Sequence, residues 1–300
     1  MAIDRDGFWT DNTPLEPITV LPEVVYTPES LVRRPGRLIH GLVVDLLASR
    51  ELAWRLFVRN ISAQYRQTMF GYLWAFLPAL ATTVLWCFLH SQKILDFETS
   101  DIPYPVFVLT GTVLWQTFVE SLNAPLKAIN QSRSMLARTN FPREAILATA
   151  VGEVLFSFCI RLLLLAGVLV WFQRALPTTI FLVPFGVMAI IGLGFALGLI
   201  LVPVGALYQD VGRAITTIVG FWMFLTPVIY PPPTTWPAEL VNSINPVSPL
   251  LLTTRDWLLS GETAWLPGFC LVSLGTTIVL FFSLLAFRIA IPIMIERMSA

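Results

Sequence analysis

A few ionisable side chains interrupt the long apolar runs of this chain, and their spacing is its first chemical signal. Glu153, Ser157 and Arg161 follow one another at intervals of four residues, so on a helix they share one face. Glu120 lies near the end of the preceding apolar run. Ionisable groups at membrane depth are unfavourable and turn toward protein or water. We therefore expect Glu153 and Arg161 to be intramembrane charges in a structural ion pair, with contact between Arg161 and a phosphate group as the alternative.

Aromatic residues inside the apolar runs are the second signal. Trp115 and Phe118 are three residues apart, as are Phe221 and Phe224, so each pair can share a helix face. Aromatic rings offer flat surfaces for the C–H faces of sugars, without the fixed donor geometry that would trap a sliding polymer. With Tyr230, these residues are candidates to line a substrate channel. Packing against lipid or neighbouring helices is an equally open alternative.

The sequence offers little for catalysis. The phosphate loop of ATPases needs a Gly immediately before its Lys, and neither lysine of this chain follows a glycine. The zinc-site patterns HExxH and CxxC do not occur. We therefore expect no catalytic residue, no metal site and no cofactor. A membrane glycosyltransferase is the alternative from another class, because Asp96, Glu98 and Asp101 cluster, although a solvated loop accounts for them better.

The elements that must position these residues are transmembrane helices. The 300 residues are 56% hydrophobic and 13% charged, against about 45–50% and about 25% in soluble chains. A span needs about 20 apolar residues and, as a helix, satisfies its own backbone. The predicted class is an all-α integral membrane protein with six transmembrane helices. The six runs are residues 72–89, 104–122, 146–171, 180–203, 214–230 and 267–286.

The distribution of Lys and Arg predicts the orientation of these helices. Cytoplasmic loops carry an excess of both residues. They gather in residues 50–66 and 127–143, on the side of the two termini, whereas the loops of the other side hold Lys93, Arg174 and Arg255. Both termini of this multi-pass protein are thus expected in the cytoplasm. The formal net charge of zero gives no indication of a nucleic-acid partner.

The segments outside the spans complete the expected organisation. Residues 1–36 are polar and proline-spaced, as in a flexible cytoplasmic arm. In residues 37–70 apolar positions recur at helical spacing beside a stripe of arginines, which predicts an interfacial amphipathic helix; a soluble helix is the alternative.

The transmembrane domain, residues 71–290, contains two further segments and is followed by a cytoplasmic tail, residues 291–300. Residues 123–144 form a basic cytoplasmic loop between the second and third spans. Residues 231–266, between the fifth and sixth spans, combine helix breakers with an apolar stretch too short to cross. That pattern predicts an external re-entrant hairpin.

Three stretches carry a family resemblance. They read YRQTMFGYLW at 65–74, NFPRE at 140–144, and YQDV at 208–211 followed by TPVIYP at 226–231 and INP at 244–246. Together they resemble the permease subunits of bacterial polysaccharide-export ABC transporters of the type-2 class. Those transporters export O-antigen, teichoic acid or capsule chains. A type-2 ABC permease for drugs or small lipids is the alternative within this class.

The resemblance implies an assembly and a substrate. Two copies of this chain would form a continuous channel, and two copies of a separate ABC ATPase subunit would bind ATP and Mg and dock beneath them. The chain itself would be a transport subunit and no enzyme. A glycan on a polyprenyl-pyrophosphate lipid would pass from the cytoplasmic leaflet of the bacterial inner membrane to the outside.

Two groups of residues take expected roles in that assembly. Arg55, Arg59 and Arg66 form the polar stripe of the interfacial helix, where each basic residue near anionic lipid contributes about 1 kcal/mol, and we expect them to gate the anionic head group. A short helix-compatible stretch of the basic loop is expected to press into the ATPase; a solvated loop is the alternative. Its residues are Ser132, Arg133, Ser134, Met135 and Leu136.

Overall fold

The computed structural model describes residues 2–3, 9–10, 49–66, 71–94, 102–138, 143–208 and 210–299. Most of the expected arm, residues 1–36, lies outside the described residues. So do residues 37–48 of the expected interfacial helix and the acidic cluster within 95–101.

Helices make up nearly all of the described chain. Apart from one antiparallel pair of two-residue strands, β1 (Ala2–Ile3) and β2 (Trp9–Thr10), every described element is helical. The elements labelled η2 and η3 are short 3-10 helices. In chain order the helices are α2 (Arg50–Arg66), η2 (Gly71–Ala75), α3 (Leu77–Ser91), α4 (Tyr104–Gln131), α5 (Arg133–Arg138), α6 (Glu144–Trp171), η3 (Thr178–Leu182), α7 (Val183–Gly205), α8 (Asp210–Leu225), α9 (Ala238–Ile244), α10 (Val247–Leu259) and α11 (Leu266–Ser299).

Three stretches of the described chain are long and apolar enough to cross a bilayer: α6, η3 together with α7, and α11 as far as Ile291. The apolar helix α3 is shorter, at 15 residues. Helix α4 is as long as α6, at 28 residues, but it is less apolar because it carries Gln116, Glu120 and Asn123. The expected class of helical membrane protein is confirmed, whereas the count of six crossings stays a prediction.

Helices α4 and α7 form the centre of the bundle and meet through two glycines. A Cβ atom on Gly194 would lie 2.7 Å from the carbonyl oxygen of Phe118, and one on Gly198 would lie 2.2 Å from that of Leu122. Small residues four apart let two helix backbones approach closely in a membrane. These glycines therefore set the distance between α7 and the helix that carries Trp115, Phe118 and Glu120.

The expected fifth span ends earlier than its apolar run. Helix α8 stops at Leu225, just before Thr226 and Pro227. Proline lacks an N–H group and disfavours helical backbone at the preceding residue. Beyond it the chain turns across α4, where a Cβ atom on Gly111 would lie 2.1 Å from the carbonyl oxygen of Val228. The turn that follows α8 is thus packed against α4.

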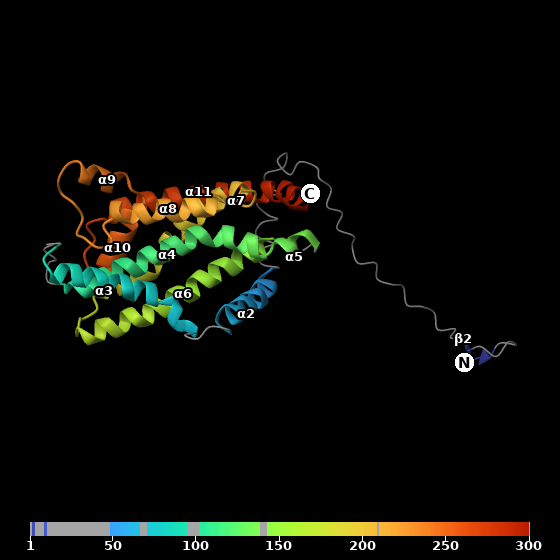
Figure 1. Ribbon diagram of the computed structural model, residues 1–300, viewed down its shortest axis with the longest axis horizontal. Coiled ribbons are helices and arrows are strands. Elements are labelled where there is room, and N and C mark those ends of the chain that lie inside the picture. The colour runs from blue at the N-terminus through green and yellow to red at the C-terminus, as the bar shows by residue number, and fades with distance from the viewer. Residues whose placement is uncertain are drawn as a thin grey trace.

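The two ends of the bundle differ. Figure 1 shows α5 and the C-terminus at one end and α9 and α10 at the other. The apolar stretch predicted to dip into the membrane is α10, which is buried along most of its length. It packs against α7 and α11. The hydroxyl of Thr179 donates to the carbonyl of Trp257 at 2.7 Å, so η3 holds the end of α10.

Candidate transport site

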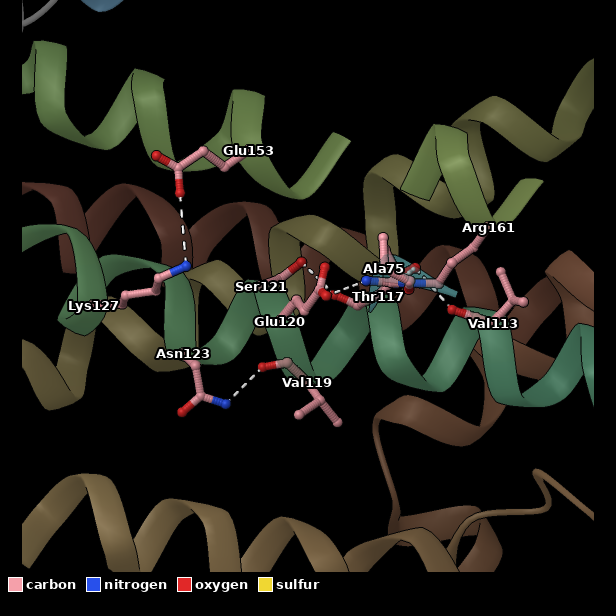
Figure 2. A network of polar contacts seen from close by, with 10 residues as sticks. All are labelled: Ala75, Val113, Thr117, Val119, Glu120, Ser121, Asn123, Lys127, Glu153 and Arg161. Carbon is pink, nitrogen blue, oxygen red and sulfur yellow. Dashed lines mark hydrogen bonds and ion pairs between the residues drawn. The ribbon is translucent and has the colours of Figure 1, made fainter. Parts of the chain in front are cut away.

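Two ion pairs join α4 and α6 in an antiparallel register (Figure 2). Arg161 of α6 binds Glu120 of α4. Two turns earlier on α6, Glu153 Oε2 lies 3.9 Å from the Nζ atom of Lys127, which is two turns further along α4. Glu153 and Arg161 are thus each paired with a residue of the neighbouring helix α4 and not with one another.

Arg161 is buried, with 1% of its side chain exposed. Besides Glu120, its Nη1 donates to the hydroxyl of Thr117 and its Nε to the carbonyl of Ala75, both at 3.2 Å. A buried guanidinium is stable only with such partners. Arg161 thus ties α6 to α4 and to η2, and in this structure it is closed to a phosphate group.

Glu153 connects α2 to the same two helices. The Nδ2 atom of Asn60 donates to Glu153 Oε1 at 2.8 Å. Earlier along both helices the hydroxyl of Thr149 donates to the carbonyl of Ala53 at 3.1 Å. A Cβ atom on Gly152 would lie 3.2 Å from the Cδ2 atom of the Phe57 ring, so the two helices pack closely here. Helix α2 therefore lies along the first half of α6.

A cavity of about 430 Å³ opens beside these ion pairs. Ser157, which stands midway between Glu153 and Arg161 on α6, is on its wall. So are Gln116 and Glu120, one turn apart on α4. The complete lining comes from six elements and comprises Gln64, Trp74, Ala75, Pro78, Trp115, Gln116, Val119, Glu120, Ser157, Thr216, Val219, Gly220 and Met223.

The two predicted aromatic pairs lie in different environments. Trp115 and Phe118 are buried, with ring centroids 5.3 Å apart, and Phe118 has no exposed surface. Both pack edge-on against Trp222, whose Nε1 donates to the side-chain oxygen of Asn245 at 3.1 Å. Phe118 therefore contacts protein alone in this structure, whereas Trp115 also reaches the cavity wall.

The other pair lies on the open side of α8. Phe221 and Phe224 are 68% and 55% exposed. Phe224 also packs edge-on against Trp86 of α3, with centroids 6.2 Å apart. The hydroxyl of Tyr230 donates to the carbonyl of Phe224 at 2.9 Å. The five channel candidates thus divide into an internal pair and a group at the surface of α8.

The described part of the expected interfacial helix is amphipathic. In α2 the side chains of Ala53, Leu56 and Ile61 are buried. Arg55 is exposed and pairs with Glu51 at 2.6 Å, one turn away. Arg59 donates to Asn60 at 3.1 Å, and Arg66 is exposed at the end of the helix. All three arginines are thus available at the protein surface.

The stretch expected to contact the ATPase includes the short helix α5. Ser132 and Leu136 are buried within this chain and Met135 is half-buried. The exposed Arg133 donates to the carbonyl of Ala206, at the end of α7. The side chain of Ser134 lies outside the described residues. Helix α5 also packs on α11, so it is seated on two long helices.

A buried arginine at the opposite end of the bundle was missed by sequence reasoning. Arg255 of α10 is 3% exposed and donates to the carbonyl of Pro227 at 3.1 Å. Its guanidinium lies 3.9 Å from the ring centroid of Phe107. In the sequence, Arg255 contributes only to the predicted membrane orientation. Its partner is a backbone carbonyl, which no side-chain pattern in the sequence can identify. This hydrogen bond joins the TPVIYP turn to α10, the apolar stretch that follows it in the sequence.

The same turn is held from two further sides. The hydroxyl of Tyr104 donates to the carbonyl of Ile229 at 3.2 Å. The Nδ2 atom of Asn245 donates to the hydroxyl of Thr226 at 2.8 Å. The turn after α8 is therefore fixed to α4, α9 and α10, while the face of α8 below it stays open.

Comparison with known proteins assigns the class. A family model described as ABC-2 type transporter matches residues 51–256, and the chain belongs to this family. It is therefore an integral membrane protein of transporter type. Among the residues that the structure describes, no group of three or more His, Cys, Asp or Glu could hold a metal ion.

Three curated relatives narrow the resemblance. The chain is 30% identical over 193 residues to the O-antigen export system permease protein RfbA of Myxococcus xanthus, covering 63% of this chain and 72% of the relative. It is 22% identical over 245 residues to the protein of that name from Klebsiella pneumoniae, covering 77% and 91%. It is 24% identical over 242 residues to the polysialic acid transport protein KpsM of Escherichia coli, covering 78% and 91%. The predicted family resemblance is confirmed.

Proposed function

We propose that this chain is the transmembrane subunit of an ATP-driven exporter of lipid-linked polysaccharide across the bacterial cytoplasmic membrane. The observation that carries the proposal is the agreement of its relatives. They match most of the chain, and their names specify O-antigen export and polysialic acid transport. The substrate is a glycan of O-antigen, capsule or teichoic acid type on a polyprenyl-pyrophosphate lipid.

The working assembly is a homodimer with two ABC ATPase subunits, which bind ATP and Mg. The open face of α8 supports a second copy. Within the described chain α8 buries Ile215 and Val219 but exposes Phe221 and Phe224. Membrane helices associate through close packing. A second copy against this side would bring the exposed rings of both copies, and Tyr230 beside them, to the path between them.

The proposed membrane arrangement has six crossings and both termini in the cytoplasm. The 16 residues of α8 extend about 24 Å, so this crossing needs the following turn or a thinner bilayer to span a core of about 30 Å. Helix α10, of 13 residues, enters and leaves on the external side. The proposed divisions are an arm at 1–36, the interfacial helix at 37–70, the membrane domain at 71–290 and a tail at 291–300.

The proposed ATPase contact is the stretch from Ser132 to Leu136, which includes most of α5, within the cytoplasmic segment 123–144. The contacts of α5 with two long helices support this proposal. Arg133 is hydrogen-bonded to the carbonyl of Ala206 at the end of α7, and α5 packs on α11. A displacement of α5 would therefore act on both helices. Helix α2 lies in the same half of the bundle as α5 (Figure 1), and its arginines are proposed to receive the anionic lipid head group.

A deletion strain of the source bacterium tests this function. Without the chain, the lipid-linked polymer should accumulate inside the cell and disappear from the surface. The intact gene should restore export. Normal surface polymer in the deletion strain would reject the proposal. Loss of drug or small-lipid efflux in that strain would favour the alternative permease class.

A further inference from the structure

We infer that the cavity between α4, α6 and α8 is a binding site for a sugar ring of the transported glycan, and not for its pyrophosphate. This inference rests on the proposed function and specifies which chemical part of the substrate the site takes. It follows from the polar groups on the cavity wall, from their charge and from the elements that bring them together.

Polar side chains from four helices converge on this cavity. Gln64 comes from α2, Gln116 and Glu120 from α4, Ser157 from α6 and Thr216 from α8. Polar groups at membrane depth are unfavourable unless they face protein partners or a polar ligand. Their convergence on one hollow therefore indicates a site that handles a polar group.

Three of these side chains are not used by the fold that the structure describes. Thr216 donates to the carbonyl of Gly212, and Glu120 is bound by Arg161. Within the described parts of the chain, no hydrogen bond engages the side chains of Gln64, Gln116 and Ser157. An amide and a hydroxyl each both donate and accept, as sugar hydroxyls require.

Aromatic surface completes the chemistry of a sugar site. Trp74 and Trp115 line the cavity together with Pro78 and Met223. Such surfaces pack against the C–H faces of a sugar ring while the amides and hydroxyls bind its edge. A volume of about 430 Å³ falls within the roughly 300–1,000 Å³ of small-molecule sites.

The charge of the wall argues against a pyrophosphate in the same place. Glu120 is the ionisable residue of the lining, and because it is already paired with Arg161 the wall offers no free positive charge to a phosphate. The adjacent Arg161 is buried, and its Nε, Nη1 and Nη2 atoms engage Ala75, Thr117 and Glu120. A neutral, hydroxyl-rich ring fits this wall, whereas a phosphate requires exposed cations such as those of α2.

The position of Ser157 explains how the fold keeps the site open. Glu153, one turn before it, is tied to Asn60 and Lys127, and Arg161, one turn after it, is tied to α4 and η2. These contacts hold α2, α4 and α6 together above and below Ser157. The ion pairs and hydrogen bonds of Glu153 and Arg161 therefore fix the helices on both sides of the cavity, which Gln64 of α2 also lines.

The test compares two lipids on the purified permease–ATPase complex in proteoliposomes. One probe is polyprenyl pyrophosphate that carries an oligosaccharide of the native glycan, and the other is the same lipid without sugar. The sugar-dependent part of the ATPase stimulation is the difference between them. Gln116→Leu and Ser157→Ala should each lower the apparent affinity in this part about fivefold, the effect of one lost hydrogen bond. The response to the sugar-free lipid should stay unchanged.

Matched controls make each outcome decisive. Asn123→Leu removes another α4 amide, one that donates to the carbonyl of Val119 at 2.8 Å and points away from the ion pairs (Figure 2). Thr277→Val removes an exposed hydroxyl of α11. Both controls should behave as wild type. An unchanged sugar-dependent response in Gln116→Leu and Ser157→Ala, or an equal loss for both lipids, would overturn the inference. A wild-type complex that responds to neither lipid would instead reject the proposed function.

Discussion

The guanidinium of Arg161 on α6 binds the carboxylate of Glu120 on α4, at the edge of the cavity that Glu120 lines. The same guanidinium holds the carbonyl of Ala75 in η2, which also lines the cavity. One buried side chain thus fixes two walls of the candidate site. Arg161 affects the candidate site by positioning these walls and not by contact with a ligand, because its own side chain is only 1% exposed.

Replacing Arg161 should therefore destabilise the protein. Arg161→Leu leaves the half-exposed Glu120 without its charge partner and also removes the hydrogen bonds to Thr117 and Ala75. A hydrogen bond to a charged group contributes about 1.5–3 kcal/mol, so we expect a loss of about 3 kcal/mol. Lys127→Met breaks the wider, half-exposed pair with Glu153 and should cost less than about 1 kcal/mol. Thermal unfolding of the purified complex measures both. Equal losses in the two variants would contradict the role assigned to Arg161, and Arg161→Leu/Glu120→Leu should recover part of the stability.

Close contact between α4 and α7 should make Gly198 intolerant of a side chain. Gly198→Ala places a Cβ atom against the carbonyl of Leu122, and overpacking of this kind costs about 1–3 kcal/mol. Gly275→Ala on α11 is the control, because no atom lies within 4 Å of its added Cβ. The yield of folded protein in mild detergent should fall for Gly198→Ala alone. A normal yield for that variant would show that the two helices are not packed this tightly.

The arginines of α2 should govern export without affecting assembly. Changing Arg55, Arg59 and Arg66 together to Gln removes three exposed charges, each of which contributes about 1 kcal/mol near anionic lipid. Export should fall strongly while the complex still purifies intact. Arg174→Gln, just beyond the far end of α6, is the control and should export normally. If the triple variant exports normally, the three arginines are membrane anchors only.

The two aromatic pairs should respond differently to truncation. Phe118→Ala empties a fully buried site and should cost about 3–5 kcal/mol, seen as a lower yield of folded complex. The double variant Phe221→Ala/Phe224→Ala changes exposed rings, so the complex should assemble but export shorter or fewer long chains. Ile218→Ala, also exposed on α8, should have little effect. Chains of normal length from the double variant would exclude these two rings from the channel.

Local patterns predicted much of this fold, and long-range partners account for what they missed. Apolar runs located the long helices, and a spacing of four placed Glu153, Ser157 and Arg161 on one face. The same spacing could not identify Glu120, Lys127 and Asn60 as partners, because these come from other helices. Periodicity likewise grouped the aromatic pairs correctly on their own helices. Which pair is buried depends on what packs against each helix, and sequence spacing alone does not contain that information.

The proposed export function is tested most directly by reconstitution of this chain with its partner ATPase in proteoliposomes. The measurement is ATP-dependent movement of a polyprenyl-pyrophosphate-linked glycan from the ATPase side of the membrane to the other side. We expect movement that requires both subunits, ATP and Mg, and that stops when the ATPase is inactivated. Glycan that stays on its original side in a complex with active ATPase would contradict it, as would ATP hydrolysis by this chain alone.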